Sequence, residues 1–269
     1  MSDGRWIQLA DGIHVRRYEE LDLSVGLVVG TRRCLVVDTR GSAAQGAELA
    51  AAVRELTGLP WTVALTHAHF DHSFGTAAFR PAPVWAHPGC RDALATDGEA
   101  QRAEWAARYR ADGHARLAAD LAASPIVLPD RLVAGSTRLD LGGRSVLLTH
   151  LGPAHTGHDL AVHVPDAGVV FAGDLVEHEP GGSFTAESFG PDTHLEAWPA
   201  ALDRLLALAP DVVVPGHGEP VGRGFVVWAR MTLATLAGLR AAVRSGRLDA
   251  DAAVRDAPLA PDVTRAALT

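Results

Sequence analysis

The sequence predicts an α/β fold in which two mixed β-sheets pack face to face between outer helices, an αββα sandwich. Three observations lead to this prediction. Short apolar runs typical of strands alternate with longer alanine-rich runs typical of helices. This rhythm occurs in both halves of the chain, without a repeat of solenoid type. Polar side chains that can bind metal follow several strands. A 269-residue α/β chain is commonly one unit, so we expect a single domain over 1–269.

The N-terminal part begins as an antiparallel sheet and continues as strands separated by helices. Short strands with turns between them occupy 6–37. Residues 43–57 are rich in alanine, carry apolar residues at helical spacing and precede a glycine, which predicts a helix. The strand 61–65 follows, and 73–79 is expected to begin another helix behind it.

The second half changes from inserted helices back to strands and ends in helices. Residues 88–124 are rich in Ala, Arg, Asp and Glu, with an apolar helical stripe that includes Trp105 and Tyr109. Strands are expected within 126–164 and over 211–214, with an amphipathic helix at 195–208 between them. A C-terminal helical segment at about 225–269 begins with a long helix, and its last 25 residues form a short helix or fray.

The densest polar cluster is His67-Ala68-His69-Phe70-Asp71-His72, directly after the strand 61–65. Three imidazoles and a carboxylate so close together are too many metal-seeking groups for a solvated surface. If the strand continues, His67 and His69 point the same way and converge on one ion. Asp71 and His72 lie where the chain turns and can face a second ion. Imidazole and carboxylate ligands suit zinc, so the cluster predicts hydrolysis.

Three further candidate ligands each follow a short apolar strand and a glycine or proline. They are His155, Asp174 and His217. Glycine- and proline-containing loops let side chains point into a cleft. We expect these ligands, at the carboxyl ends of several strands, to meet along one edge of a sheet.

The ordered motifs HxHxDH, GPAHTGHD, AGD and PGHG resemble those of the metallo-β-lactamase-fold hydrolase superfamily, over roughly 36–218. This resemblance implies the metallo-β-lactamase fold and two Zn²⁺ ions, with Fe or Mn as alternatives. The implied ligands are His67, His69 and His155 for the first metal, Asp71, His72 and His217 for the second, and Asp174 bridging both. Among them, Asp71, His155 and Asp174 are expected to be catalytic.

Asp174 separates subfamilies within the resemblance. The commonest zinc β-lactamases carry a cysteine ligand there, whereas relatives resembling glyoxalase II, lactonases and RNA-processing nucleases carry aspartate. We therefore expect a dinuclear site whose metal-bound hydroxide cleaves a small carboxylic acid derivative: a thioester, lactone, ester or lactam. Asp71 is expected to orient the nucleophile as well as to bind metal. The alternatives are a single-iron oxidoreductase resembling persulfide dioxygenases, a biosynthetic lyase or cyclase, and a metal-stabilised scaffold protein.

Residues around the ligands have expected roles of their own. The resemblance implies that Asp38 orients the metal loops without binding metal, and Asp159 is expected to hydrogen-bond a loop or a ligating imidazole. Arg40 is interpreted as an exposed residue at a strand end, or else as a donor to a substrate carboxylate. The insertion at about 88–124 is expected to form a cap, with a dimer interface as the alternative. A mobile loop at 176–194 is expected over the metals.

Composition limits the partners of the protein. The net charge of −8 repels phosphate backbones, which argues against nucleic acid as a partner and favours a small-molecule substrate. All 24 basic residues are arginine, so no lysine can act as a base or form a Schiff base. We expect no apolar run of the ~20 residues that span a bilayer, and the N-terminus does not resemble a secretory signal. We therefore expect no membrane partner and a cytoplasmic protein, with a homodimer left open.

Overall fold

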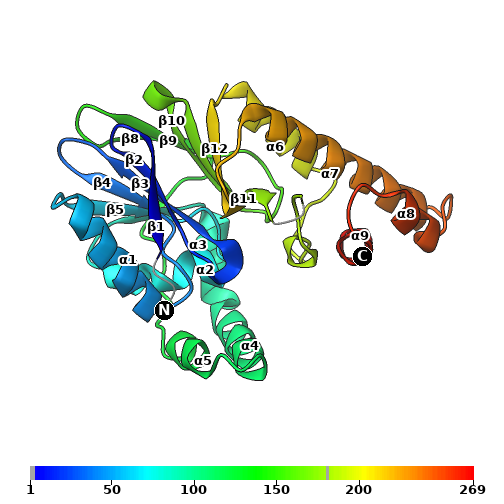
Figure 1. Ribbon diagram of the computed structural model, residues 1–269, viewed down its shortest axis with the longest axis horizontal. Helices are drawn as coiled ribbons and strands as arrows, with labels where there is room; N and C mark the ends of the chain where they lie inside the picture. The colour runs from blue at the N-terminus through cyan, green and yellow to red at the C-terminus, as the bar shows by residue number, and fades with distance from the viewer. Residues whose placement is uncertain (1–3, 180–181) are drawn as a thin grey trace.

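Two mixed sheets lie face to face in the computed structural model, which describes residues 4–179 and 182–269 (Figure 1). The first sheet has seven strands in the order β1-β2-β3-β4-β5-β6-β7, antiparallel from β1 to β4 and parallel from β4 to β7. The strands are β1 (Arg5–Ala10), β2 (Ile13–Arg17), β3 (Ser24–Val29), β4 (Cys34–Val37), β5 (Trp61–Ala64), β6 (Val84–Ala86) and β7 (Arg131–Leu132).

The second sheet has five strands in the order β12-β11-β10-β9-β8. All its pairs are antiparallel except β11 with β12, which is parallel. The strands are β8 (Ser136–Asp140), β9 (Ser145–His150), β10 (Leu160–Val164), β11 (Val169–His178) and β12 (Val212–Gly218).

Three apolar clusters hold the layers together and confirm the predicted sandwich. The cluster between the sheets includes Leu35, Leu148 and Phe171. A second cluster packs α1 (Ala43–Leu56) on the outer face of the first sheet, and a third packs α6 (Trp198–Ala207) and α7 (Arg223–Arg244) on the outer face of the second. Because these faces are removed from water, each fully buried leucine or phenylalanine contributes roughly 1.5–3 kcal/mol to folding.

The segment that carries the HxHxDH motif is a turn, and the expected continuation of the strand is wrong. β5 ends at Ala64, and a short turn leads into α2 (Phe70–Ser73). The backbone N–H of Thr66 donates to Oδ1 of Asp38 at 2.7 Å, so a side chain, and not a neighbouring strand, accepts this hydrogen bond. The helix expected at 73–79 is a 3₁₀ helix, η2 (Phe74–Phe79).

β11 and β12 are longer than predicted, because both continue through the residues expected to follow them. The register between the two strands shifts around Gly173, where φ is +55°. A Cβ at this position would lie 2.7 Å from Cβ of Thr66, so glycine is required by space as well as by conformation. After this irregularity β11 continues to His178, which places Asp174 inside a strand.

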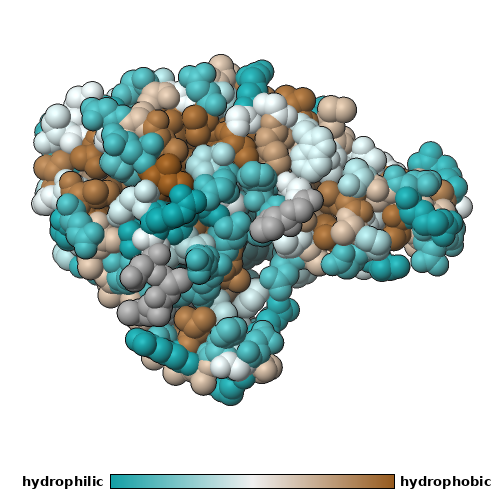
Figure 2. Space-filling model, viewed as in Figure 1, coloured by the Kyte–Doolittle hydropathy of each residue, from teal (hydrophilic) through white to brown (hydrophobic). Residues whose placement is uncertain are grey.

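Helices occupy the predicted insertion and the C-terminal segment. Residues 88–124 form α3 (Pro88–Thr96), α4 (Gly98–Ala111) and α5 (Ala115–Ala122). α7 extends away from the sheets, with α8 (Ala250–Asp256) at its far end and α9 (Pro261–Leu268) folded back beneath it (Figure 1). The far end of this arm is mainly hydrophilic (Figure 2). The remaining 3₁₀ turns are η1 (Glu20–Asp22), η3 (Pro165–Ala167) and η4 (Ala186–Ser188).

One expectation about apolar runs is wrong. Within the described part of the chain, one helix, α7, is long enough and apolar enough to cross a membrane, by length and composition alone. Core helices of other proteins meet the same criteria, so one such helix is weak evidence for a membrane span.

Candidate metal centre

All seven predicted ligands lie together, in two adjoining groups. Within each group the potential ligand atoms lie within 4.8 Å of one another. The first group is His67, His69, His155 and Asp174, and the second is Asp71, His72 and His217. The HxHxDH motif follows β5 of the first sheet, whereas the other ligands come from the β9–β10 loop, β11 and β12 of the second. The three later ligands therefore come from one edge of the second sheet, as expected, and the HxHxDH motif meets them from the first sheet.

The first group closes around facing nitrogen and oxygen atoms. Nδ1 of His69 lies 3.0 Å from Nε2 of His155. Oδ2 of Asp174 lies 3.5 Å from Nε2 of His67 and 3.4 Å from Nε2 of His155. All four groups therefore present a lone pair or a ring nitrogen to one small volume, which is the arrangement that a metal ion requires.

The second group has the same character and shares Asp174 with the first. Oδ2 of Asp71 lies 3.5 Å from Nε2 of His72 and 3.3 Å from Nε2 of His217. Oδ1 of Asp174 lies 3.2 Å from Nε2 of His72, and its Oδ2 lies 3.4 Å from Nε2 of His217. The Asp174 carboxylate therefore lies between the two groups.

Asp38 orients the motif from behind. Its carboxylate accepts hydrogen bonds from the backbone N–H of Thr66 at 2.7 Å and the Thr66 hydroxyl at 2.8 Å, and lies 2.9 Å from Nδ1 of His72. The Thr66 hydroxyl also lies 3.0 Å from Nδ1 of His67. With each Nδ1 bearing the proton, each Nε2 can offer a lone pair to a bound metal ion. Asp38 has φ +65°, so these bonds hold a residue in the left-handed region.

Two further groups that hold imidazoles were missed from the sequence. Oδ2 of Asp192 lies 3.2 Å from Nε2 of His69, and Nδ1 of His217 donates to the carbonyl of Leu21 at 2.6 Å. The only signal for Asp192 is that it is an acidic residue in the loop expected over the metals. The Leu21 carbonyl has no signal in the sequence, because any residue supplies a carbonyl.

The buried atoms of the cluster fit a metal ion. Nε2 of His67 and Oδ1 of Asp174 are buried and make no hydrogen bond within the described residues. A buried polar atom left unpaired destabilises a fold by about 1–3 kcal/mol. Two such atoms within one cluster of potential ligands therefore indicate a missing partner. Imidazole nitrogen and carboxylate oxygen are ligands of zinc and of other transition metals.

The candidate ligand imidazoles differ in their electrostatics. Burial opposes charge on His69, but its contact with Asp192 outweighs burial and raises its pKa. Burial lowers the pKa of His155 to about 4 and holds that of His67 well below its usual range, so both imidazoles are neutral, as metal binding requires. Burial opposes charge on His72 and His217 as well, but Asp174 and Asp71 outweigh it and raise both pKa values well above the usual range. In the metal-free protein these two imidazoles carry protons that a bound cation would displace.

Asp159 and Arg40 have structural contacts. Asp159 accepts hydrogen bonds from the backbone N–H and hydroxyl of Thr156 at 2.9 and 2.7 Å, and so fixes the loop that carries His155. Burial raises the pKa of Asp159 to about 7. The expectation of an exposed Arg40 is wrong.

Arg40 is only 5% exposed and lies within a network of charged and aromatic side chains. Its guanidinium pairs with Glu48 at 2.9 Å and Glu20 at 3.3 Å, and stacks 3.6 Å above the Tyr18 ring centre. These partners bury the side chain and pair with both of its terminal nitrogens, so Arg40 does not extend towards a substrate carboxylate.

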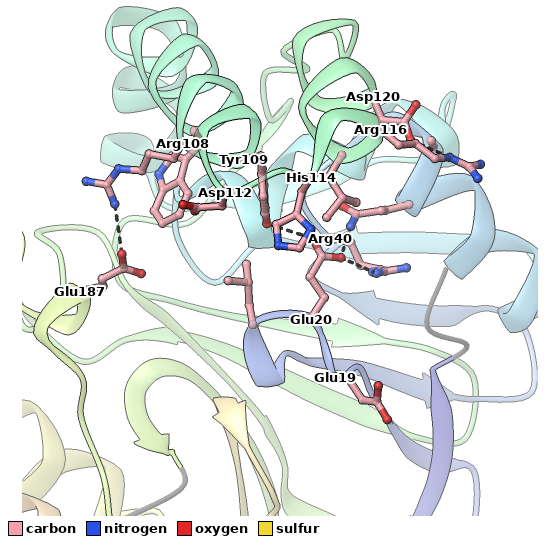
Figure 3. Close-up of a pocket in the computed structure, with 15 residues that line it drawn as sticks. Glu19, Glu20, Arg40, Arg108, Tyr109, Asp112, His114, Arg116, Asp120 and Glu187 are labelled. Atoms are coloured by element: carbon pink, nitrogen blue, oxygen red, sulfur yellow. Dashed lines mark hydrogen bonds and ion pairs between the residues drawn. The ribbon is translucent and has the colours of Figure 1, made fainter.

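The metal centre opens into a cavity of about 910 Å³ between α4 and the segment 185–192. Trp105 lines it and stacks on Phe70, with ring centres 4.5 Å apart. Tyr109 instead lines a neighbouring cavity of about 740 Å³ (Figure 3). Trp105 thus lies at the predicted mouth and Tyr109 does not. Positions 180–181 of the predicted 176–194 loop lie outside the described residues.

Comparison with known proteins decides the family. A profile of the metallo-β-lactamase superfamily matches residues 20–217, which is most of the chain. The chain belongs to the metallo-β-lactamase superfamily. A metallo-β-lactamase type 2 of Bacteroides fragilis is 29% identical over 94 residues, which is 34% of this chain and 36% of that protein. The matched segment therefore spans about a third of this curated relative.

Solved metallo-β-lactamases share the fold of this superfamily member. TMB-1 has a TM-score of 0.65 at 16% identity and covers 88% of this chain and 100% of its own. The enzyme of Pontibacter korlensis has a TM-score of 0.62 at 19% identity, covering 86% and 98%. That of Erythrobacter litoralis has a TM-score of 0.63 at 19% identity, covering 87% and 97%. Family and His/Asp cluster together indicate a metal-dependent hydrolase.

Proposed function

We propose that the protein is a dinuclear zinc hydrolase that cleaves a small carboxylic acid derivative: a thioester, lactone, ester or lactam. The position of Asp174 carries this proposal. Its Oδ1 faces His72 at 3.2 Å and its Oδ2 faces His155 at 3.4 Å, so one carboxylate serves both ligand groups. A carboxylate placed in this way favours two ions over one. The nitrogen and oxygen ligands favour zinc, with Fe or Mn as alternatives.

When bound, the two ions would lower the pKa of water and polarise the substrate carbonyl. The side chains of the protein supply the remaining functions. Asp71, next to His217, accepts a hydrogen bond from the attacking nucleophile and keeps it oriented towards the carbonyl carbon. Asp192 keeps Nε2 of His69 turned outward, so that Nδ1 faces the centre. No serine or cysteine nucleophile is required.

The stacked rings at the cavity mouth have a role in binding. Trp105 and Phe70 form an apolar wall beside the ligands and exclude water from one side of the reacting carbonyl. The cavity of about 910 Å³ accommodates a small molecule. A small-molecule substrate, and not nucleic acid, also agrees with the net charge of −8.

Metal analysis and a substrate panel test this function. Anaerobically purified protein should contain two zinc ions per chain, whereas one iron ion would favour the oxidoreductase alternative. Chromogenic thioester, lactone, ester, lactam and phosphodiester substrates are then compared with and without chelator. Replacing His69 or Asp174 with Ala should abolish turnover, whereas His114→Ala, on the exposed start of α5, should retain it. A His69→Ala protein with full metal content and full activity would falsify the proposal.

A further inference from the structure

The GPAHTGHD motif contains a second imidazole, His158, which belongs to neither ligand group. His158 follows the ligand His155 by three residues and is only 8% exposed. Histidine is seldom buried without a partner for its ring nitrogens. The contacts of this imidazole therefore indicate what it does beside the metal centre.

His158 binds the backbone of the HxHxDH motif. Its Nε2 accepts a hydrogen bond from the backbone N–H of Ala68 at 3.3 Å. Ala68 stands between the ligands His67 and His69 and is 3% exposed. Because Nε2 is the acceptor, the ring proton of His158 lies on Nδ1. The Nε2 lone pair is thus used to fix the backbone that carries two ligands, and not to bind metal.

The same hydrogen bond joins the two sheets. Ala68 follows β5 of the first sheet, whereas His158 precedes β10 of the second. Close by, the backbone N–H of Leu160 donates to the carbonyl of Thr66 at 2.8 Å. These two bonds fix the HxHxDH turn relative to the loop of the GPAHTGHD motif. The first ligand group takes its histidines from both segments, so its shape depends on this joint.

The HxHxDH turn is held by one side chain from each sheet. Asp38, directly after β4, accepts from the backbone N–H of Thr66 at 2.7 Å, and His158 accepts from that of Ala68 two residues further on. Both donors lie between β5 and α2, where no strand or helix ladder supplies an acceptor. Buried backbone N–H groups require partners, so each of these side chains stabilises one conformation of the turn.

Burial alone does not explain the bond to Ala68. His163, in β10, is also 8% exposed, yet its Nδ1 is buried and makes no hydrogen bond within the described residues. An imidazole can therefore be buried in this part of the second sheet without such a partner. Burial also lowers the pKa of His158 to about 4, so its ring is neutral and can accept a hydrogen bond at neutral pH.

We propose that His158 is a positioning residue of the metal centre, which holds Ala68 so that His67 and His69 face the same ion as His155. This inference rests on the metal site of the proposed function and adds a residue to it. His158 acts through the backbone and touches neither the ion nor the substrate. Without an acceptor at this place the Ala68 N–H turns towards another partner, and the two neighbouring imidazoles move with it.

The hydrogen bond is tested first in the metal-free wild type, where no substitution can interfere with folding. Long-range ¹H–¹⁵N spectra of the imidazole rings report which nitrogen carries the proton, and the signals of His158 are those absent from His158→Gln. The contact with Ala68 requires the proton on Nδ1. A proton on Nε2 would overturn the inference, because two N–H groups cannot form a hydrogen bond with each other.

Two substitutions then separate hydrogen bonding from packing. Glutamine carries its carbonyl oxygen the same number of bonds from Cβ as histidine carries Nε2, whereas methionine has a methyl group there. We expect His158→Met to weaken one of the two zinc equivalents at least about tenfold, the lower limit for loss of a group that orients ligands. His158→Gln should restore the affinity and should also protect the Ala68 amide from hydrogen exchange, which His158→Met should not. His163→Met removes an imidazole of the same exposure from β10 and should bind zinc like the wild type.

The outcomes distinguish this inference from the proposed function. Zinc affinity is measured by competition with a chromophoric chelator. Wild-type affinity in His158→Met, or an equal loss in His158→Gln, would overturn the positioning role and leave the proposed hydrolase intact. If His158→Met does not fold, a tenfold loss in folded His158→Gln would still overturn it. A wild type that binds no zinc would contradict the proposed hydrolase, while the ring tautomer still decides whether His158 holds the turn.

Discussion

The substitution Asp38→Asn tests how the metal ligands are oriented. Asp38 has φ +65°, and asparagine tolerates this left-handed conformation, so the backbone should remain in place. The native carboxylate accepts from three donors, the backbone N–H and hydroxyl of Thr66 and Nδ1 of His72, at 2.7, 2.8 and 2.9 Å. Asparagine has one acceptor oxygen, and its amide N–H₂ must face at least one of these donors.

The magnitude of the effect follows from these contacts. A buried donor left without an acceptor reduces the free energy of unfolding by about 1–3 kcal/mol. His72 can restore a hydrogen bond by accepting at Nδ1, but its proton then lies on Nε2 and blocks the lone pair that faces the second group. Loss of such a hydrogen bond weakens metal binding about 10–100-fold. We therefore expect one tight zinc equivalent to remain and the second to weaken by this factor.

Competition against a chromophoric zinc chelator measures both equivalents, and urea denaturation of the metal-free protein measures stability. Asp166→Asn, which removes a half-exposed carboxylate paired with Arg144, serves as the control and should match the wild type in zinc binding. Two zinc equivalents of wild-type affinity in Asp38→Asn would refute the role of Asp38 in orienting His72.

Three further predictions concern stability and metal removal. Arg40→Ala should reduce the free energy of unfolding by roughly 3 kcal/mol, since it leaves Glu20 without its cation and Glu48 with Arg16 alone, and KM of the folded enzyme should not change; a KM increase without destabilisation would contradict this. Burial raises the pKa of Asp159 from 3.8 to about 7, so its contribution to stability is present below about pH 4 and is lost as pH rises towards 7. In urea titrations at pH 5 and 8, Asp159→Asn should therefore lose less stability with rising pH than the wild type, and an identical pH dependence would be evidence against a buried acid. Chelation should abolish turnover and lower Tm, with both restored by zinc, because a ligand that binds only the folded state stabilises it; a chelated enzyme of unchanged Tm and activity would show that the seven side chains hold no metal.

The ligands were predictable because their signals are local in the sequence. The HxHxDH motif places four potential ligands within six residues, and the other three follow short apolar runs with glycine or proline. The four layers were predictable from the alternation of apolar strands and alanine-rich helices. Both features depend on neighbours in the chain, which a single sequence records.

Features that depend on contacts between distant residues could not be predicted. The end of β5 depends on Asp38, which takes the N–H of Thr66 from 28 positions away. The continuation of β11 beyond Gly173 depends on pairing with β12. The burial of Arg40 depends on aromatic and acidic partners from separate elements. Periodicity carries no information on such pairings.

The hydrogen bond between His217 and the carbonyl of Leu21 joins segments 196 positions apart. It has a consequence for synthesis on the ribosome. Asp174 is held by the pairing of β11 with β12, so both ligand groups wait for β12, and the second also waits for its contact with the earliest part of the chain. A nascent chain would accordingly assemble the two groups together, only after most of its residues have been translated.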